Sequence, residues 1–231
     1  MTRRYPHTRN RLRQRYRVLD WLRGGTLSPP ARTRALSLLV SQRLSSMKYN
    51  ARARQKLLLL TRRHIQDLIL RDCHWCGRAM AGGVDRLDSS KGYVSSNVVP
   101  ACCECNFAKG AMPPEQFVRM AQAVARRKPN GSTWTRQSPV SYAQWLREMK
   151  DPEARRVSVS PAYYLRLRDD DCFFCGLAPA WGVDRIDPKG PYAPGNCRAA
   201  CKVCNWARRS APTEAFVAMC RRVARRSLRL G

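Results

Sequence analysis

One segment of the chain occurs twice, and the two copies are separated by a constant offset of 99 positions, as from Cys73 to Cys172. Residues 72–127 align with residues 171–226 without a gap, and about half of the aligned residues are identical. Two unrelated basic segments would not keep one register through so many rare residues. The pattern therefore indicates an internal duplication, and the chain is expected to contain two similar modules.

Each copy carries two Cys-x-x-Cys pairs that are separated by 25 residues. Zn²⁺ prefers tetrahedral thiolate coordination, and a gap of two residues lets both sulfurs of a pair reach one ion. Gly77 and Gly176 follow the first pair of each copy, where a knuckle turn needs a positive φ. A module of about 55 residues has a small core, so metal binding would supply much of its folding free energy. The sequence predicts two structural Zn²⁺ ions, bound by Cys73, Cys76, Cys102 and Cys105 in the first module and by Cys172, Cys175, Cys201 and Cys204 in the second.

Three further cysteines, Cys103, Cys197 and Cys220, fall outside these pairs. Cys103 could compete with Cys102 for the metal, but the repeat favours Cys102. An odd total of eleven cysteines argues against a disulfide framework. We therefore expect the three to be buried free thiols in a protein of a reducing, intracellular compartment.

The formal net charge is +28, from 44 Lys and Arg against 16 Asp and Glu. Eight thiolates bound to two Zn²⁺ ions would leave about +24. A compact chain with this charge repels itself unless a partner neutralises it, and phosphate backbones are the usual partner. Arg outnumbers Lys, which suits bidentate phosphate contacts. A membrane partner is not expected, because apolar runs such as Leu57–Leu60 are far shorter than the ~20 residues of a spanning helix.

The sequence divides into five expected segments. Residues 1–30 form an Arg-rich arm, 31–71 a helical basic region, 72–127 the first zinc module, 128–170 a linker with helices, and 171–231 the second zinc module. The arm is expected to become ordered on nucleic acid. An Arg-rich start also resembles an organellar transit peptide, so a mitochondrial location stays open. The arginines of the arm that we expect to contact nucleic acid are Arg9, Arg11, Arg13, Arg15 and Arg17.

Apolar residues at helical spacing predict helices over residues 31–47 and 51–70, and two shorter helices over 140–149 and 161–168. Each module is expected to end in a helix, because Pro113 and Pro212 are followed by an acidic residue, which is a helix-start signal. The expected fold class is α+β, with a mainly helical basic region before two small modules. The terminal helices are predicted over 115–127 and 214–230, with a buried stripe of Phe117, Val118, Met120 and Val124 that is repeated as Phe216, Val217, Met219 and Val223.

Module one reads Cys-x-x-Cys-Gly, then Gly83-Val84-Asp85-Arg86-Leu87-Asp88, Gly92-Tyr93, Asn97 and Cys102-x-x-Cys105-Asn106. This order resembles the zinc-stabilised HNH and endonuclease VII-like family over about 40 residues of each module. The resemblance implies a treble-clef fold, which consists of a zinc knuckle, a β-hairpin and a helix that carries the second Cys pair. In nucleases of that family an Asp and a late His or Asn hold a divalent metal, a His beside the Asp activates water, and a middle Asn orients that His. Carried over by position, the metal ligands are Asp85, Asn106, Asp184 and Asn205, and the middle Asn is Asn97 or Asn196.

Arg86 and Arg185 stand where the family places its catalytic His. An arginine stays protonated and cannot take a proton from water, which is the task of a general base. The same replacement in both modules favours a non-catalytic role, in which the Arg contacts phosphate or pairs with an Asp. In a second interpretation, hydrolysis with Mg²⁺ or Mn²⁺ uses metal-bound hydroxide or another base, such as Asp88 or Asp187. The chain has only three His, which are His7, His64 and His74, and none takes the catalytic position.

A simpler role is also open for the polar residues of the hairpin. Asp85 and Asp88 could shape the turn, and Asn97 and Asn196 could cap the segment before the second Cys pair. Aromatic residues between the charges could stack on bases, although packing on a helix face is the commoner fate of Trp145 and Tyr164. These aromatic residues are Tyr5, Tyr16, Trp21, Trp134, Tyr142, Trp145, Tyr163 and Tyr164.

These patterns lead to one functional hypothesis and two alternatives. We expect a zinc-stabilised scaffold that contacts structured RNA of a ribonucleoprotein particle, or a DNA backbone, through Arg86, Arg185 and the arm. The first alternative is a metal-dependent HNH endonuclease. The second is a protein–protein assembly module, whose charge only keeps it soluble and whose nucleic-acid binding would be weak.

Overall fold

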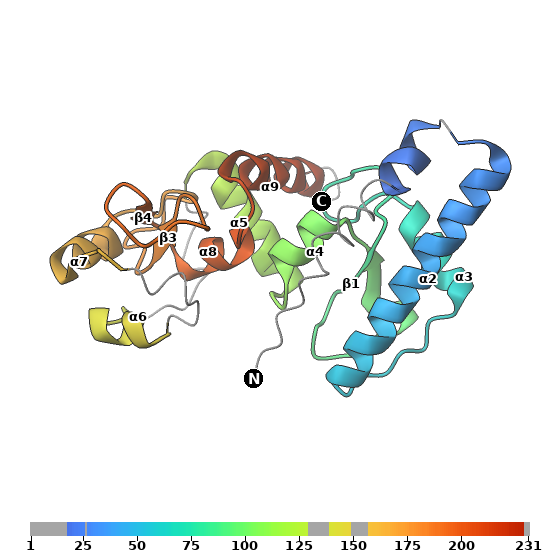
Figure 1. Ribbon diagram of the computed structural model, residues 1–231, viewed down its shortest axis with the longest axis horizontal. Coiled ribbons are helices and arrows are strands. Elements are labelled where there is room, and N and C mark those ends of the chain that lie inside the picture. Colours follow the sequence, from blue (N-terminus) through green and yellow to red (C-terminus); the bar gives the residue numbers. More distant parts are fainter. Residues whose placement is uncertain (1–17, 26, 129–138, 149–156, 229–231) are drawn as a thin grey trace. The chain divides into compact units, whose positions relative to one another are not determined.

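The structure is a computed structural model, and it describes residues 18–25, 27–128, 139–148 and 157–228 (Figure 1). The chain divides into two compact units, residues 1–106 and 107–231. In the described part of the chain, helices are combined with two small antiparallel sheets, one in each module. A mixed fold with two similar modules was expected, and it is confirmed at this level.

Three helices lie in the described N-terminal part of unit 1. Residues 18–24 are helical, α2 spans Pro29–Ala53, and α3 spans Arg62–Leu70. The predicted break between residues 47 and 51 is wrong, because Met47 and Ala51 lie one helical turn apart on the buried face of α2 and the helix continues through them. The chain turns only after α2, where Gln55 has a φ of 52°.

The predicted arm also ends earlier than expected. Leu19 and Leu22 are buried and pack in the same core as Leu39 and Val40 of α2, so residues 18–24 belong to the folded unit. Arg23 fixes this helix by donating to the carbonyl oxygens of Ala79 and Met80 at 3.1 and 2.9 Å. The arm arginines Arg9, Arg11, Arg13, Arg15 and Arg17 lie outside the described residues.

Both modules build the same hairpin and helix. In module one, β1 (Val84–Arg86) pairs with β2 (Val98–Pro100), and α4 (Cys103–Lys109) follows. In module two, β3 (Val183–Arg185) pairs with β4 (Cys197–Ala199), and α8 (Lys202–Arg208) follows. A short 3-10 helix, η1 (Ser95–Asn97), precedes β2. The register sets Asp85 opposite Val99 and Asp184 opposite Arg198.

The repeat begins earlier than the predicted boundaries at residues 72 and 171. Helix α7 (Pro161–Asp169) repeats α3 at the same 99-residue offset. Just before these helices, Leu58 bridges to Tyr93 and Val157 bridges to Tyr192. Helices α3 and α7 pack on the two strands of their own modules. The sequence hides this part of the repeat, because Leu68 and Leu167 form the only identical pair between residues 57–71 and 156–170.

Unit 2 contains the terminal helices of both modules. Helices α5 (Pro114–Arg126) and α9 (Thr213–Ser227) begin and end within three residues of their predicted bounds. The last residues of the predicted second helix, 229 and 230, lie outside the described residues. They pack side by side (Figure 1), and Gln122 Nε2 donates to Ser227 Oγ at 3.1 Å. Val118 and Val217 of the predicted stripes are only half-buried. The buried residues of the pair are Phe117, Met120, Ala121, Ala123 and Val124 of α5 and Phe216, Met219, Cys220, Val223 and Ala224 of α9.

Aromatic packing fixes α6 (Tyr142–Glu148) to module two. Trp145 stacks on Tyr164 with ring centroids 4.7 Å apart and meets Tyr192 edge-on at 5.0 Å. Tyr164 of α7 is buried and donates its hydroxyl to the Val140 carbonyl at 2.9 Å. The expectation that Trp145 and Tyr164 pack on a helix face is confirmed. Among the described helices, none combines the length and apolar character that crossing a membrane requires.

Candidate functional site

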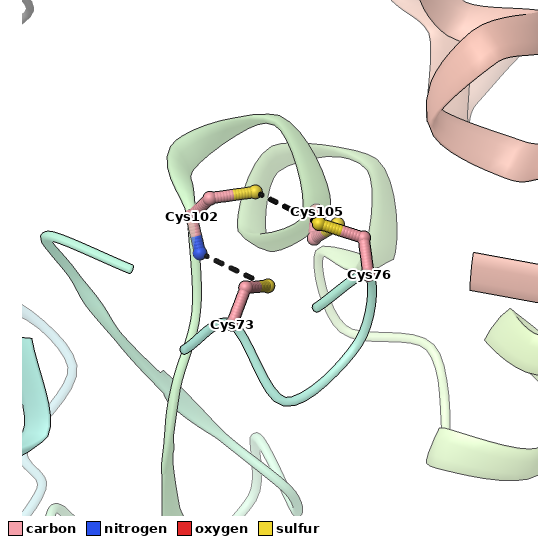
Figure 2. A group of neighbouring side chains, drawn as sticks. All are labelled: Cys73, Cys76, Cys102 and Cys105. Carbon is pink, nitrogen blue, oxygen red and sulfur yellow. Dashed lines mark hydrogen bonds between the residues drawn. The ribbon is translucent and has the colours of Figure 1, made fainter. Parts of the chain in front are cut away.

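Four buried cysteine sulfurs converge in each module. In module one the sulfurs belong to Cys73, Cys76, Cys102 and Cys105 and lie within 4.8 Å of one another (Figure 2). Sγ of Cys76 is 3.7 Å from Sγ of Cys102, and the equivalent distance in module two, from Cys175 to Cys201, is 3.8 Å. Sulfurs about 2.3 Å from a tetrahedral Zn²⁺ ion would be separated by about 3.8 Å. Both clusters therefore fit one structural metal ion each.

The local fold explains why the sulfurs meet. Gly77 and Gly176 have φ of 73° and 70°, and their N–H groups donate to the carbonyls of Cys73 and Cys172. This closes the predicted knuckle turn and brings the first pair together. The second pair comes from the start of α4 or α8, and the N–H of Cys102 donates to Cys73 Sγ at 3.3 Å.

The electrostatics of the clusters also favour a bound cation. Hydrogen bonding from the Cys102 thiol lowers the pKa of Cys73 to about 7, whereas burial raises the pKa of Cys204 well above its ordinary value. The first thiolate in a cluster is stabilised by the remaining thiols, but four thiolates together would repel one another in a buried site. A divalent ion removes this repulsion, because a coordinating thiol is deprotonated outright.

The three remaining cysteines lie outside the clusters. Cys197 and Cys220 are buried, as predicted, and burial raises the pKa of Cys197 to about 11. Cys103 is only half-buried, contrary to the prediction, because it begins α4 next to the ligand Cys102 rather than facing the core. It is not a member of the metal cluster, so the preference for Cys102 is confirmed.

Asn97 and Asn196 close the loop of each hairpin. Oδ1 of Asn97 accepts from the Asp88 N–H at 2.9 Å, and its Nδ2 donates to the carbonyls of Asp88 and Gly92. Asn196 repeats these contacts with Asp187 and Pro191. The middle Asn therefore holds the loop between the strands. The alternative prediction of a cap before the second Cys pair is wrong, because the amide points into the loop.

Arg86 and Arg185 hold the same loops from the other side. Arg86 Nη1 donates to the Lys91 carbonyl at 2.8 Å, and its guanidinium lies 4.8 Å over the Tyr93 ring. Arg185 makes the same two contacts with Gly190 and Tyr192. Arg86 is buried and Arg185 is half-buried. The two guanidinium groups thus face the loop and an aromatic ring, and the contact of Arg86 and Arg185 with nucleic acid stays a prediction.

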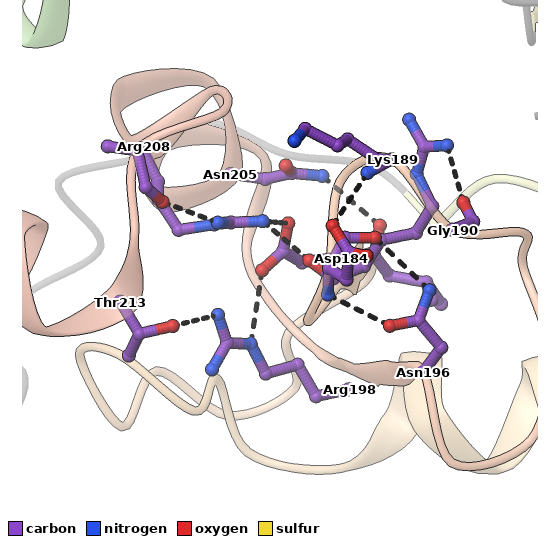
Figure 3. Close-up of polar contacts among 12 residues, drawn as sticks. Asp184, Lys189, Gly190, Asn196, Arg198, Asn205, Arg208 and Thr213 are labelled. Carbon is purple, nitrogen blue, oxygen red and sulfur yellow. Dashed lines mark hydrogen bonds and ion pairs between the residues drawn. The ribbon is translucent and has the colours of Figure 1, made fainter.

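Asp184 lies between two arginines (Figure 3). Its Oδ1 is 2.7 Å from Arg208 Nη2, and its Oδ2 is 3.1 Å from Arg198 Nε. Arg198 also donates through Nη2 to Thr213 Oγ1 at 2.8 Å. Arg208 donates to the carbonyls of Arg185 and Ala211. Both oxygens of this buried carboxylate are therefore paired with cations of the protein.

The buried carboxylate of Asp85 has a different hydrogen-bond donor from that of Asp184. Oδ2 of Asp85 accepts from the indole Nε1 of Trp75 at 3.1 Å. Phe174 takes the place of Trp75 in module two and has no donor, whereas Arg198 takes the place of Val99 and supplies one. The two modules thus serve the same buried Asp in two ways. Such compensation is what a structural carboxylate requires, because an unpaired buried charge is costly.

The other members of the implied catalytic set also have structural roles. Asn106 and Asn205 donate through Nδ2 to the carbonyls of Val84 and Val183, both at 3.1 Å, and so tie the metal-binding helix to the first strand. Asp88 is the proposed substitute base, and the hydroxyl of Ser90, which donates to it at 2.6 Å, lowers its pKa. A lowered pKa makes this carboxylate a poorer proton acceptor near neutral pH.

Sequence reasoning missed the partners of the two aspartates. Trp75 is part of the knuckle, Arg198 is on β4, and Arg208 is the last residue of α8. A signal was present in the alignment of the two modules, where the exchange of Trp75 for Phe174 coincides with that of Val99 for Arg198. Its meaning depends on the strand register, which the sequence does not state.

Comparisons with known proteins leave the family open. No protein-family model matches the chain, and no solved structure matches it. The chain is similar to "Uncharacterized protein R423" of Acanthamoeba polyphaga mimivirus, with 27% identity over 195 residues, which are 77% of this chain and 36% of the viral protein. The chain thus spans about a third of the length of this relative. The name of the relative states no activity.

Proposed function

We propose that this protein is a zinc-stabilised, non-catalytic scaffold that binds nucleic acid through its basic surface. Its two modules are treble clefs of the HNH type, in which the knuckle, the hairpin and the metal-binding helix are kept and the hydrolytic centre is replaced. The knuckles, the two hairpins and the position of α4 and α8 support the treble-clef assignment. Zinc is the metal we propose, because four thiolates are its usual structural ligands.

The observation that carries the non-catalytic part is the double ion pair of Asp184. In an HNH-type nuclease this carboxylate would hold the divalent metal, but here Arg198 and Arg208 neutralise it. Arg185, in the position of the catalytic His, is held on Gly190 and Tyr192. Module two thus lacks both groups that activate water for phosphodiester hydrolysis, and in module one Arg86 takes the position of the general base.

The nucleic-acid part rests on the charge of the chain. After two Zn²⁺ ions have neutralised part of eight thiolates, about +24 remains. Several arginines serve the fold, such as Arg62, which donates to Ser37 and Ser41 of α2, but these are few against 44 basic residues. Structured RNA within a ribonucleoprotein is the partner we favour, and DNA is the alternative.

The first experiment measures binding and cleavage together. Zinc-loaded protein is titrated into labelled duplex DNA, single-stranded DNA and structured RNA over a series of salt concentrations, and the same substrates are incubated with Mg²⁺ or Mn²⁺. We expect tight binding whose log K falls with log[salt] by about 0.9 for each duplex phosphate that is neutralised. We expect no cleavage.

Two results would contradict the proposal in different ways. Cleavage that disappears in the double variant Asp85→Ala, Asp184→Ala, with both zinc ions retained, would identify an HNH endonuclease. Weak binding that does not change with salt would favour a protein–protein assembly module. The zinc content of every preparation is measured by atomic absorption, so that a loss of binding is not confused with a loss of folding.

A further inference from the structure

Helix α8 exposes a tryptophan to solvent close in the chain to the buried cysteine cluster of module two. Trp206 is 71% exposed, two residues after the metal-cluster residue Cys204. Lys202 is the first residue of α8, four residues before Trp206, and Arg209 directly follows the last residue of α8; both side chains are also exposed. Burying an indole ring usually stabilises a fold, so a Trp left in water beside two cations calls for a partner.

The other module exposes an aromatic ring at the same position of the repeat. Phe107 of α4 is 52% exposed and corresponds to Trp206 at the 99-residue offset. The guanidinium of Arg209 lies 6.0 Å over the Phe107 ring, and in the chain Arg209 is three residues after Trp206. We call Lys202, Trp206, Arg209 and Phe107 the α8 patch. An exposed aromatic ring at this position in both modules indicates that the ring binds a partner.

The chemistry of the α8 patch narrows the class of its partner. A flat aromatic ring offers a stacking face, and the neighbouring cations favour an anionic partner. Unpaired nucleobases on a phosphate backbone have both properties. The bases of a duplex are already stacked and have no free face to offer.

We propose that the α8 patch is a stacking site for unpaired bases of a single-stranded or bulged nucleic acid, with Trp206 as the platform and Arg209 and Lys202 as phosphate contacts. This inference rests on the proposed nucleic-acid binding and adds to it a preference for unpaired strands. In an RNA partner, the site would take a loop or a bulge.

The test compares variants on a fluorescein-labelled single-stranded oligonucleotide and on the blunt duplex of the same sequence, by fluorescence anisotropy. Trp206→Ala is expected to weaken single-strand binding about tenfold, which corresponds to about 1.4 kcal/mol and is typical of one lost base stack. Duplex binding is expected to stay unchanged. Trp206→Phe, which installs the residue of module one, should retain most of the affinity. Arg209→Ala should lower the single-strand salt slope by about 0.7.

Leu57→Ala is the control. Leu57 is 66% exposed between α2 and α3, and its side chain has no aromatic face on which a base could stack. Its replacement should change neither affinity. Each variant is compared with the parent protein in zinc content and in sedimentation velocity.

The outcomes separate this inference from the proposed function. If the parent binds the single strand tightly and Trp206→Ala binds it equally well, the α8 patch is not a stacking site, and the proposed function stands. An equal loss on duplex and single strand would also overturn the inference. If the parent binds neither nucleic acid, the proposed function fails and the inference fails with it. If Trp206→Ala turns a dimer into a monomer without changing nucleic-acid affinity, the patch is a contact between two copies of the chain, which overturns the inference.

Discussion

At the scale of single residues, the two modules present a natural exchange of buried hydrogen-bond donors. Asp85 is served by the indole of Trp75, and Asp184 is served from the facing strand by Arg198. Arg198 also stacks on the ring of Phe174 at 4.5 Å, in the place where module one has Trp75. The donor to the buried Asp is therefore part of the knuckle in module one and is on the facing strand in module two.

This exchange predicts a compensating pair of substitutions in module two. Arg198→Val should destabilise the zinc-loaded protein by about 2 kcal/mol, because Asp184 keeps Arg208 but loses one charged donor in a buried site. Adding Phe174→Trp, which restores the donor of module one, should recover about half of this loss. Urea unfolding of the parent, the two single variants and the double variant measures the coupling between the two positions.

Purely additive losses in this cycle would show that the indole does not replace the guanidinium. The mirror exchange in module one, Trp75→Phe with Val99→Arg, is the matched control, and it should show coupling of the same sign. If only one module shows coupling, the modules do not share a common aspartate site.

Residues differ in how far the sequence alone predicts their roles. The eight metal-cluster cysteines were predicted because two-residue spacing and a local turn determine where their sulfurs lie. Arg198 was not predicted, because its partner is across a strand pair whose register depends on the whole hairpin. Trp206 was missed for a similar reason, since an apolar residue in a short helix is expected to be buried until its surroundings are known.

At the scale of elements, the terminal helices were predicted from the residues and the hairpins from the family resemblance, whereas some of the neighbouring helices were missed. Helices α5 and α9 were predicted almost to the residue, because proline and glutamate mark their starts and apolar spacing marks their buried faces. The end of α2 and the extension of each repeat to α3 and α7 were missed. Helix α2 continues because Met47 and Ala51 are on its buried face. Helices α3 and α7 keep the same position in each repeat because both pack against the strands, although almost every side chain differs between them.

The metal clusters support elements that could not persist alone. Helices α4 and α8 have seven residues each, below the ~12–15 that an isolated helix needs in water. Removing the metal with a strong chelator should therefore open α4, α8 and both hairpins. Hydrogen–deuterium exchange read by mass spectrometry should show faster exchange there than in the 25-residue helix α2.

Single ligand substitutions test whether the two clusters act separately. Cys76→Ser and Cys175→Ser should each lose one metal ion and accelerate exchange only in their own module. Cys103→Ser should keep both ions, because Cys103 lies beside the cluster but outside it. Unchanged exchange in α4 and α8 after verified metal removal would mean that packing alone holds these elements.

At the scale of the whole molecule, the two copies of the repeat contact each other through their last helices. Helix α5 comes from the first copy and α9 from the second, and each covers the apolar face of the other within unit 2. Both faces repeat Phe and Met at matching positions, Phe117 with Phe216 and Met120 with Met219. A single module with such an exposed apolar face would associate with another copy. In this chain the second module supplies the helix that covers the face.

The charge of the whole molecule leads to a last prediction, on stability rather than affinity. About +24 on a chain of this size repels itself, and this repulsion is absent or weaker in the expanded unfolded state. Salt screens exposed charges over about 10 Å at 0.1 M, whereas the buried pair of Asp184 with Arg208 is screened much less. Raising NaCl should therefore increase the Tm of the zinc-loaded protein, with about 2–4 °C for each kcal/mol of repulsion that is relieved.

A polyanion should act more strongly than the same ionic strength of NaCl, because it binds the folded basic surface as well as screening it. Scanning calorimetry with NaCl, KCl and inorganic polyphosphate at matched ionic strength separates the two effects. A Tm that falls with NaCl would mean that surface ion pairs, such as Arg78 with Glu104, stabilise the fold more than like charges destabilise it. In that case the positive charge is dispersed enough to be tolerated without a partner, and the charge-based part of the proposed nucleic-acid binding loses its support.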